Sequence, residues 1–94
     1  MAKTNDWAAQ VAKVVRAIPK GKVLSYAQVA LRANKPGAAR AVVRALHSLD
    51  DIPWWRVLRS DGTVAPQMMG KQAPKLKRDG VKLTGRRVPR SARL

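Results

Sequence analysis

The stretch "SYAQVALRANKPGAARAVVRALHSL", residues 25–49, contains two short helical patterns separated by a tight turn. Ser25 can cap the first helix, because Gln28 follows three residues later as in a capping box. "NKPG" ends that helix, and apolar residues recur at helical spacing again after it. Arg40 and Arg44 lie on a different face of the second helix from these apolar residues. Two short helices, the second carrying arginines, predict a helix-turn-helix.

Further elements flank this pair of helices. Apolar spacing predicts a helix over residues 6–18, with Thr4 or Asn5 as its cap. Residues 71–80 form a weaker helical pattern that ends at a glycine. Between these segments, two β-type runs flank Asp61-Gly62, which is a strong hairpin signal. The sequence therefore predicts a mainly α fold with a small β-hairpin, arranged as a winged helix-turn-helix.

The length of 94 residues and the hydrophobic fraction of 46% allow one core. We expect residues 1–84 to form one domain and residues 85–94 to form a basic, flexible tail. No apolar run approaches the roughly 18–20 residues of a membrane span, and the first residues do not resemble a signal peptide. We therefore expect a protein of the cytoplasm that is not associated with a membrane. We also expect a monomer that is associated with the nucleoid.

Charge is the strongest global feature of the sequence. Twenty Lys and Arg against five Asp and Glu give a net charge of +15. Such a surplus repels itself and is typical of proteins with a polyanionic partner, of which nucleic acid is the first candidate. Charge alone does not separate DNA from RNA.

The chain has no cysteine and one histidine. This composition excludes disulfides and thiolate nucleophiles, and it argues against a metal site built from protein ligands alone. We therefore expect no metal, no cofactor and no catalytic residues.

Two of the three tryptophans are adjacent in "IPWWRVLRS", residues 52–60. A tryptophan that finds a pocket buries roughly 150–250 Å². We interpret this stretch as a reaction site in which a flat aromatic surface has replaced the reactive atom.

Three segments carry a family resemblance: "IPKGKVLSYAQVA", "AARAVVRAL" and "IPWWRVLRSDGTV". In this order they resemble the C-terminal DNA-binding domain of the O6-alkylguanine-DNA alkyltransferases. They are more similar still to the alkyltransferase-like proteins, which lack the reactive cysteine. The resemblance covers about residues 11–83 and implies a winged helix-turn-helix that flips a nucleotide out of duplex DNA.

The alkyltransferase site reads Pro-Cys-His-Arg, and its thiolate takes the alkyl group. The resemblance places Trp54 at the Cys position, Trp55 at the His position and Arg56 at the Arg position. Asp79 is the nearest match to the distant Glu that acts through the His. An indole N–H only donates, and its nitrogen lone pair belongs to the ring. The resemblance therefore implies a protein that is not an enzyme.

The resemblance also implies a lesion pocket and a DNA surface. Tyr26 matches the tyrosine that contacts the flipped base. Arg40 matches the arginine that fills the space that the flipped nucleotide leaves in the base stack. Trp55 is alternatively a packing residue behind the pocket, and Met68 is either a pocket lid or core filler. The implied pocket consists of Tyr26, Trp54, Trp55, Val57 (through its carbonyl) and Met68. The implied DNA contacts are Ser25, Tyr26, Lys35, Ala38, Arg40, Arg44 and Arg56.

The function implied is that of a sensor that binds O6-alkylguanine in duplex DNA and flips the lesion into a pocket lined by Trp54. The lesion would be marked for nucleotide excision repair, whose proteins would be its partners. The alternative is a winged-helix regulator or nucleoid-type protein that does not flip bases. That alternative explains the charge and the helices but not the two tryptophans. An RNA-binding role is a third interpretation.

Overall fold

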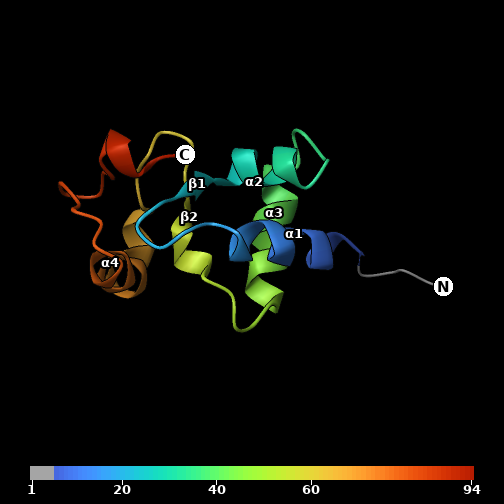
Figure 1. The fold of residues 1–94 in the computed structure, drawn as a ribbon, viewed down its shortest axis with the longest axis horizontal. Helices are drawn as coiled ribbons and strands as arrows, with labels where there is room; N and C mark the ends of the chain where they lie inside the picture. The colour runs from blue at the N-terminus through green and yellow to red at the C-terminus, as the bar shows by residue number, and fades with distance from the viewer. Residues whose placement is uncertain (1–5) are drawn as a thin grey trace.

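The computed structural model describes residues 6–94, so the expected caps Thr4 and Asn5 lie outside the described range. The described residues form four α-helices and a small sheet, and Figure 1 shows how they are arranged. The helices are α1 (Asp6–Arg16), α2 (Tyr26–Arg32), α3 (Ala39–Ser48) and α4 (Met69–Arg78). The strands are β1 (Leu24–Ser25) and β2 (Val57–Leu58). Three single 3₁₀ turns complete the fold: η1 (Trp54–Arg56), η2 (Pro66–Met68) and η3 (Arg90–Ala92).

The predicted helix-turn-helix is formed by α2 and α3. Its capping box is present, since the Gln28 N–H donates to Ser25 Oγ at 3.1 Å and the Ser25 N–H donates to Gln28 Oε1 at 2.8 Å. Asn34 turns the chain between the two helices with a φ of +67°, a conformation that asparagine tolerates. The Trp7 indole of α1 donates to the Ala41 carbonyl of α3 at 3.1 Å. These contacts join the three N-terminal helices into one unit.

The sheet is parallel, so the predicted β-hairpin is wrong. Leu24 is the partner of Val57, and Ser25 is the partner of Leu58. All four residues are buried. The short sheet therefore connects the start of the helix-turn-helix with the segment that follows the two adjacent tryptophans.

The second run of the expected hairpin pairs with the C-terminal segment. The turn at Asp61-Gly62 does form, because the Arg59 N–H donates to the Thr63 carbonyl at 3.2 Å. Beyond the turn, however, the Val64 N–H donates to the Arg86 carbonyl at 2.8 Å. The turn was predicted correctly, but long-range partners on both sides replace the local strand pairing.

Residues 85–94 are packed on the domain, which corrects the prediction of a flexible tail. Val88 and Ala92 are 2% and 5% exposed. The Val23 N–H donates to the Ala92 carbonyl at 2.8 Å, and the Leu94 N–H donates to the Val23 carbonyl at 3.1 Å. The segment is held because these apolar side chains complete a core that the rest of the chain leaves open.

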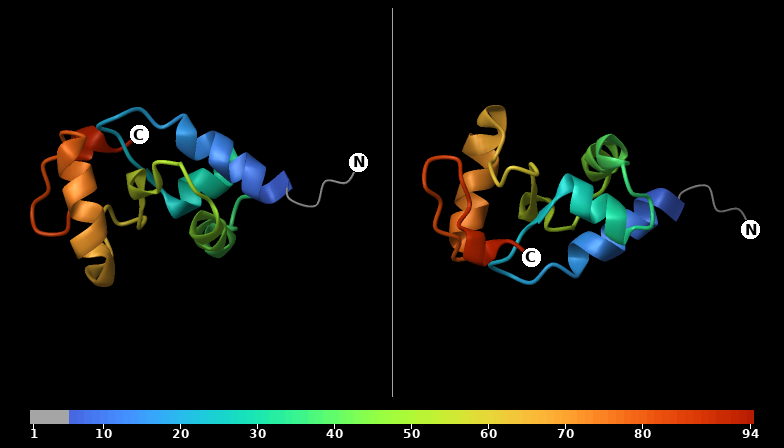
Figure 2. Two further views of the ribbon diagram at one scale, coloured as in Figure 1. Left: turned by 90° about the horizontal axis from the view of Figure 1, so that it is seen from below. Right: turned by 90° about the horizontal axis from the view of Figure 1, so that it is seen from above.

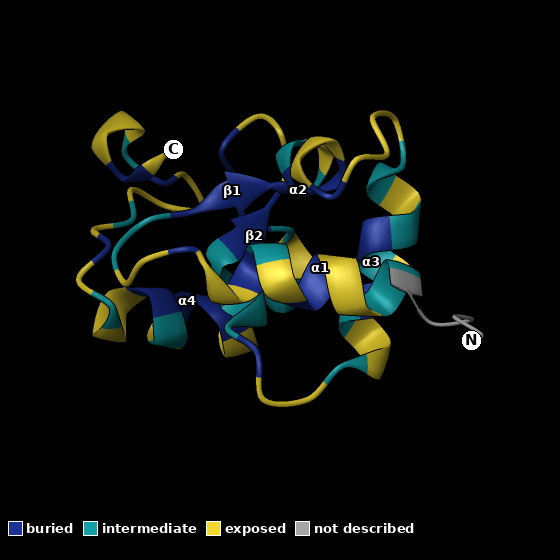
Figure 3. Cartoon of the chain, turned by 45° about the vertical axis from the view of Figure 1, so that its right-hand side comes forward, coloured by how far each residue is buried: buried dark blue, intermediate teal, exposed yellow. Residues whose placement is uncertain are grey.

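The buried side chains form two clusters, and Figure 3 shows them along the inner sides of the helices. The first cluster lies among α1, α2 and α3. The second lies between α4 and the C-terminal segment. Figure 2 shows α4 at the opposite end of the long axis from α1 and α3. The molecule measures 45 × 24 × 23 Å along its principal axes, and within residues 6–94 no helix has the length and apolarity to cross a bilayer.

Candidate nucleic-acid interface

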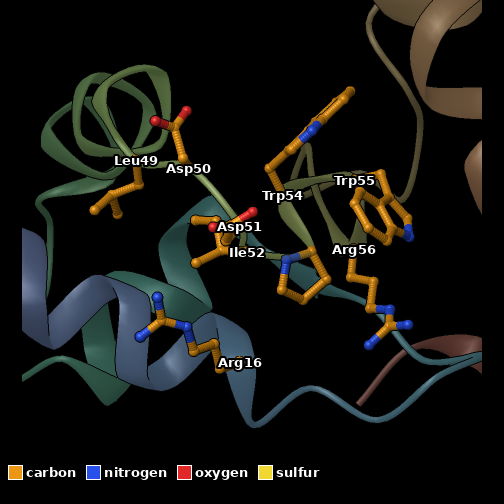
Figure 4. A pocket seen from close by; sticks show the side chains of 9 residues that line it. Arg16, Leu49, Asp50, Asp51, Ile52, Trp54, Trp55 and Arg56 are labelled. Carbon is orange, nitrogen blue, oxygen red and sulfur yellow. The ribbon is translucent and has the colours of Figure 1, made fainter.

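The two adjacent tryptophans lie on η1, which connects the two cores. The turn is closed by the Arg56 N–H, which donates to the Pro53 carbonyl at 3.0 Å. The two indoles meet edge to face, with ring centroids 6.0 Å apart and planes at 85°. Trp54 packs against the first core cluster, and Trp55 packs against the second. Figure 4 shows the two rings leaving the turn in different directions.

Asp79 lies directly after α4, and its carboxylate accepts hydrogen bonds from Trp55 and Arg56. Trp55 Nε1 donates to its Oδ2 at 3.0 Å. Arg56 Nε donates to Oδ2 at 2.7 Å, and Arg56 Nη2 donates to Oδ1 at 3.3 Å. Arg56 Nη1 also donates to the Ile18 carbonyl at 2.9 Å. By the motif resemblance, the Trp55–Asp79 bond would correspond to the His–Glu pair of the alkyltransferases.

Arg56 has an internal role rather than the DNA contact that the sequence predicted. Its side chain is 15% exposed, and the Asp79 side chain is 7% exposed. All the donors named above point to protein acceptors, so Arg56 ties η1 to α4 and to the end of α1. The motif match gave no indication of Asp79 and Ile18 as the acceptors of the guanidinium.

The Asp79 carboxyl is held in its ionised form. Burial raises the pKa of Asp79, but hydrogen bonds from Arg56 and Trp55, together with the charges of Arg56 and Lys20, outweigh burial and lower it below its ordinary value. An ionised Asp79 accepts from Trp55 but has no histidine to activate. The arrangement holds the turn in place and does not constitute a proton relay.

Trp55 is further enclosed by cations. Lys75 Nζ lies 4.9 Å from the centroid of its ring, and the Arg56 guanidinium carbon lies 5.6 Å from it. Contacts of this kind are favourable by about 0.5–1 kcal/mol at partly exposed sites. Of the two interpretations of Trp55, these contacts and its bond to Asp79 favour the packing residue behind the pocket.

Gln72 of α4 is a site residue that the sequence did not reveal. It is 2% exposed, and its Nε2 donates to the carbonyls of Trp55 and Val57, both at 2.9 Å. The Val57 carbonyl, which the resemblance assigns to the flipped base, therefore already accepts one hydrogen bond. The Val57 side chain is fully buried and lines no open surface. A lone glutamine in a basic helix gives no signal of such a role.

A cavity of about 620 Å³ opens beside η1 (Figure 4). It includes Trp54 and Trp55 but not Tyr26, Val57 or Met68, so the expected pocket residues do not all gather around it. Its remaining wall comes from α1 and from the loop after α3. The lining residues are Arg16, Leu49, Asp50, Asp51, Ile52, Pro53, Trp54, Trp55 and Arg56.

Tyr26 and Met68 lie on different cores. Tyr26 is half-buried against the first cluster, as Trp54 is, and burial raises the pKa of its phenol. The phenol therefore stays protonated at neutral pH and can donate a hydrogen bond. Met68 packs against the second cluster, which favours core filler over a pocket lid.

The predicted phosphate contacts lie around α2 and α3. Arg40 and Arg44 are exposed on α3. Ala38 precedes α3 without capping it by a side chain, so N–H groups of the first turn are free to meet an anion. Lys35 is exposed and lies 5.4 Å from the centroid of the Trp7 ring. The Ser25 hydroxyl is mostly buried and accepts from Gln28, which leaves its O–H as the group that could donate to a phosphate.

The described residues contain no group of three or more His, Asp or Glu side chains close enough to hold a metal ion.

The chain is similar to proteins that act on alkylated DNA. The family model for the DNA-binding domain of 6-O-methylguanine DNA methyltransferase matches residues 6–83. A DNA base-flipping protein of Vibrio parahaemolyticus is 36% identical over 80 residues, which are 80% of this chain and 80% of that protein. Alkyltransferase-like protein 1 of Schizosaccharomyces pombe is 31% identical over 88 residues, which are 86% of this chain and 82% of that protein.

Solved structures agree with these matches. The S. pombe Atl1 bound to damaged DNA containing O6-carboxymethylguanine superposes with a TM-score of 0.80 at 29% identity, covering 88% of this chain and 83% of that one.

A methylated-DNA–protein-cysteine methyltransferase of Mus musculus is 41% identical over 66 residues, which are 67% of this chain but 31% of that protein. The name of the mouse protein states its cysteine acceptor, and this chain has no cysteine. The chain therefore belongs to the family of the 6-O-methylguanine DNA methyltransferase DNA-binding domain, as one of its cysteine-less, alkyltransferase-like members.

Proposed function

We propose that this protein is a non-enzymatic sensor that binds O6-alkylguanine in duplex DNA, flips the lesion out of the helix and holds it against Trp54 without removing the alkyl group. The observation that carries the proposal is the pair at positions 54 and 55. The motif resemblance puts the Trp54 indole at the acceptor position, and the indole of Trp55 donates its N–H to Asp79. Neither indole has an ionisable group that could serve as a thiolate-like nucleophile, and neither has a basic lone pair that could activate one.

Binding without chemistry is energetically reasonable at such a site. Flipping a nucleotide costs a few kcal/mol, and less when a lesion has already weakened the base pair. Stacking on an aromatic ring returns roughly 1–3 kcal/mol per base, and each buried CH₂ of an alkyl group adds about 0.8 kcal/mol. Trp54 would supply this surface, with Tyr26 crowding the target phosphate.

The exposed arginines of α3 would hold the duplex. Arg40 would enter the base stack and fill the gap that the flipped nucleotide leaves, because its planar guanidinium both stacks and donates hydrogen bonds. Arg44, one turn later on the same helix, would contact phosphate. The relatives support lesion binding and flipping in general, since one is named a DNA base-flipping protein and another is solved with O6-carboxymethylguanine DNA.

Because the bound lesion is not repaired, the proposal includes a hand-off: the protein, acting as a monomer on nucleoid DNA, marks the site for nucleotide excision repair. Incision of an O6-alkylguanine duplex by purified excision-repair proteins tests this step. We expect the protein to increase the incision rate, and no increase at saturating protein would refute the hand-off while leaving lesion binding intact.

A paired titration tests the binding function itself. Two duplexes of identical mixed sequence, one with a single O6-alkylguanine, are titrated at one fixed salt concentration. The sensor should bind the damaged duplex more tightly, and the preference should grow with alkyl size. Equal affinities would favour the non-flipping regulator instead, and stronger competition by structured RNA than by DNA would indicate an RNA-binding protein.

A further inference from the structure

Arginines surround the turn at residues 59–64, and they come largely from the C-terminal segment. Arg86 Nη1 donates to the Val64 carbonyl at 3.1 Å, and Arg87 Nη1 donates to the Asp61 carbonyl at 3.0 Å. Arg93 Nη2 donates to the Ser60 carbonyl at 2.9 Å. Arg59 is exposed at the start of the turn. We call this set, Arg59, Arg86, Arg87 and Arg93, the arginine collar.

The collar is ordered before any ligand binds. Val88 and Ala92 anchor the C-terminal segment in the second core. Gly62 leaves room for the collar, because a Cβ at this position would lie 2.9 Å from Arg93 Nη1. Each of the three C-terminal arginines donates one N–H to the turn, and a guanidinium has five donors. Most of their donors are therefore free, yet the side chains are already positioned.

The positive charge of the collar is largely uncompensated. Residues 80–94 include no Asp or Glu. The carboxylate of Asp61 lies within the turn, but it already accepts from the Thr63 N–H at 3.0 Å and from Thr63 Oγ1 at 2.6 Å. Its contact with Arg59 measures 3.9 Å between side chains that are about half exposed, and such pairs contribute little. Four guanidinium groups held around one turn repel each other, and a row of phosphates would relieve that repulsion.

The collar shares an edge of the molecule with the helix-turn-helix. In Figures 1 and 3 the turn between β2 and η2, helix α2 and the turn before α3 follow one another along the upper edge. The C-terminal segment reaches the same edge, since Gln28 Nε2 donates to the Leu94 carbonyl at 2.9 Å. The long axis of 45 Å corresponds to about 13 base pairs of duplex at 3.4 Å per step along one strand. One duplex along this edge can therefore reach both surfaces.

We propose that the arginine collar is a second phosphate-binding surface, which grips the backbone of the duplex on one flank of the flipped lesion. The proposal rests on the proposed function in taking duplex DNA as the ligand, and it adds a site that α3 does not provide. Guanidinium groups bind phosphate bidentately, and phosphate contacts carry no information about the base. The collar therefore raises affinity for damaged and undamaged DNA by the same factor.

A double substitution, Arg87→Gln with Arg93→Gln, tests the collar against a matched control. The control, Lys77→Gln with Arg78→Gln in the last turn of α4, removes the same charge from exposed residues on a different element. Dissociation constants are measured by fluorescence anisotropy over a range of salt concentrations, and thermal melts verify that each variant is folded. We expect the slope of log affinity against log salt to change from about −5 to about −3 in the collar variant and to change by less than one in the control. The ratio of damaged to undamaged affinity should stay at the wild-type value.

Asymmetric duplexes give an independent measurement. Shortening one of the two flanks around the lesion should weaken binding by the wild-type protein more than binding by the collar variant, because the lost phosphates are those that the collar binds and the variant keeps only Arg59 and Arg86 of it. An unchanged salt slope, or equal changes in collar and control variants, would overturn the proposal. So would tight collar-dependent binding of phosphatidylglycerol vesicles with no effect on DNA. Absence of lesion preference in the wild type would instead contradict the proposed function and leave the collar result interpretable.

Discussion

Trp54 and Trp55 are neighbours in the sequence but serve different parts of the molecule. Trp54 packs with Tyr26 on the core of the helix-turn-helix, whereas Trp55 packs on the core of α4 and donates to Asp79. At the scale of single residues, this division gives them separate roles. In the proposed function Trp54 is the surface offered to a base, and the bond from Trp55 to Asp79 holds the turn that carries Trp54.

Trp54 and Arg40 should separate lesion recognition from general DNA binding. Trp54→Ala removes the stacking surface and should reduce the preference for large O6-alkyl groups by about 1–3 kcal/mol, with little effect on undamaged DNA. Arg40→Ala should weaken damaged and undamaged binding together. Anisotropy titrations on both duplexes measure the two effects, and equal losses of preference in both variants would show that these roles are wrongly assigned.

Asp79 makes stability depend on pH. Its pKa is lower in the folded protein than its ordinary value of 3.8, so its stabilising contribution is complete above that value and is lost as pH falls through the lower folded pKa. Asp79→Asn leaves Arg56 without its anion and should lower the free energy of unfolding at neutral pH by about 1.5–3 kcal/mol. Melts between neutral and acid pH should show a shallower loss of stability in the variant.

Asp50→Asn is the control for this experiment, because it removes an exposed carboxylate from the nearby loop. If both variants melt like the wild type at every pH, the network around Asp79 does not stabilise the turn.

Sequence reasoning succeeded at residues whose partners are local and failed where the partner is distant. The Ser25–Gln28 capping box needs only a spacing of three residues, and it is present. Arg56 was matched to its motif position, but the acceptor that occupies it lies 23 residues away in the chain. A motif gives the position of a side chain and does not show which group it binds.

At the scale of elements, α4 supports the tryptophan turn. Gln72 holds two of its carbonyls, and Asp79, just past the end of α4, holds two of its side chains. The second core, on which α4 packs, thus positions Trp54, which packs against the first core. The family resemblance extends over α4, but it does not indicate that Gln72 and Asp79 hold the tryptophan turn in place.

Gln72→Met should loosen the turn while keeping the volume of the side chain. Two buried carbonyls would lose their donor, at a cost of about 1–3 kcal/mol for each group that stays unsatisfied. We expect a lower melting temperature and a weaker preference for the lesion, with undamaged binding unchanged. The exposed Gln67→Met on η2 serves as the control. A drop in melting temperature with full lesion preference would limit Gln72 to a structural role.

Periodicity predicted the helices well and the strands poorly. The four helices lie close to the predicted ranges, because each has an apolar face with 3.6-residue spacing. The strands have two residues each, too few for a period to be recognised. Val57 and Leu58 pair with a segment more than 30 residues away, and turn residues carry no information about that distance.

At the scale of the whole molecule, two exposed surfaces of one elongated domain carry clustered arginines. One is the exposed side of α3, and the other is the arginine collar. The tail was predicted to be flexible because most of its residues are basic or small. The prediction overlooked Val88 and Ala92, whose buried side chains anchor the segment in the second core. Composition described the charge of this segment correctly and its order incorrectly.

The summed charge predicts strong salt dependence. If about five or six phosphates are neutralised, log affinity should fall with log salt at a slope near −5 for damaged and undamaged duplexes alike. Titration at several salt concentrations measures the slope. A response close to flat would mean that the positive surface does not bind the DNA backbone.

The most direct test of a sensor without repair activity is whether the lesion leaves the helix and stays unaltered. A duplex carrying O6-methylguanine next to 2-aminopurine is mixed with the protein, fluorescence is recorded, and the recovered DNA is analysed by mass. We predict a fluorescence increase that Trp54→Ala weakens, together with full recovery of O6-methylguanine. Saturated binding with no fluorescence change, or loss of the methyl group from the DNA, would contradict a protein that holds a flipped lesion without repairing it.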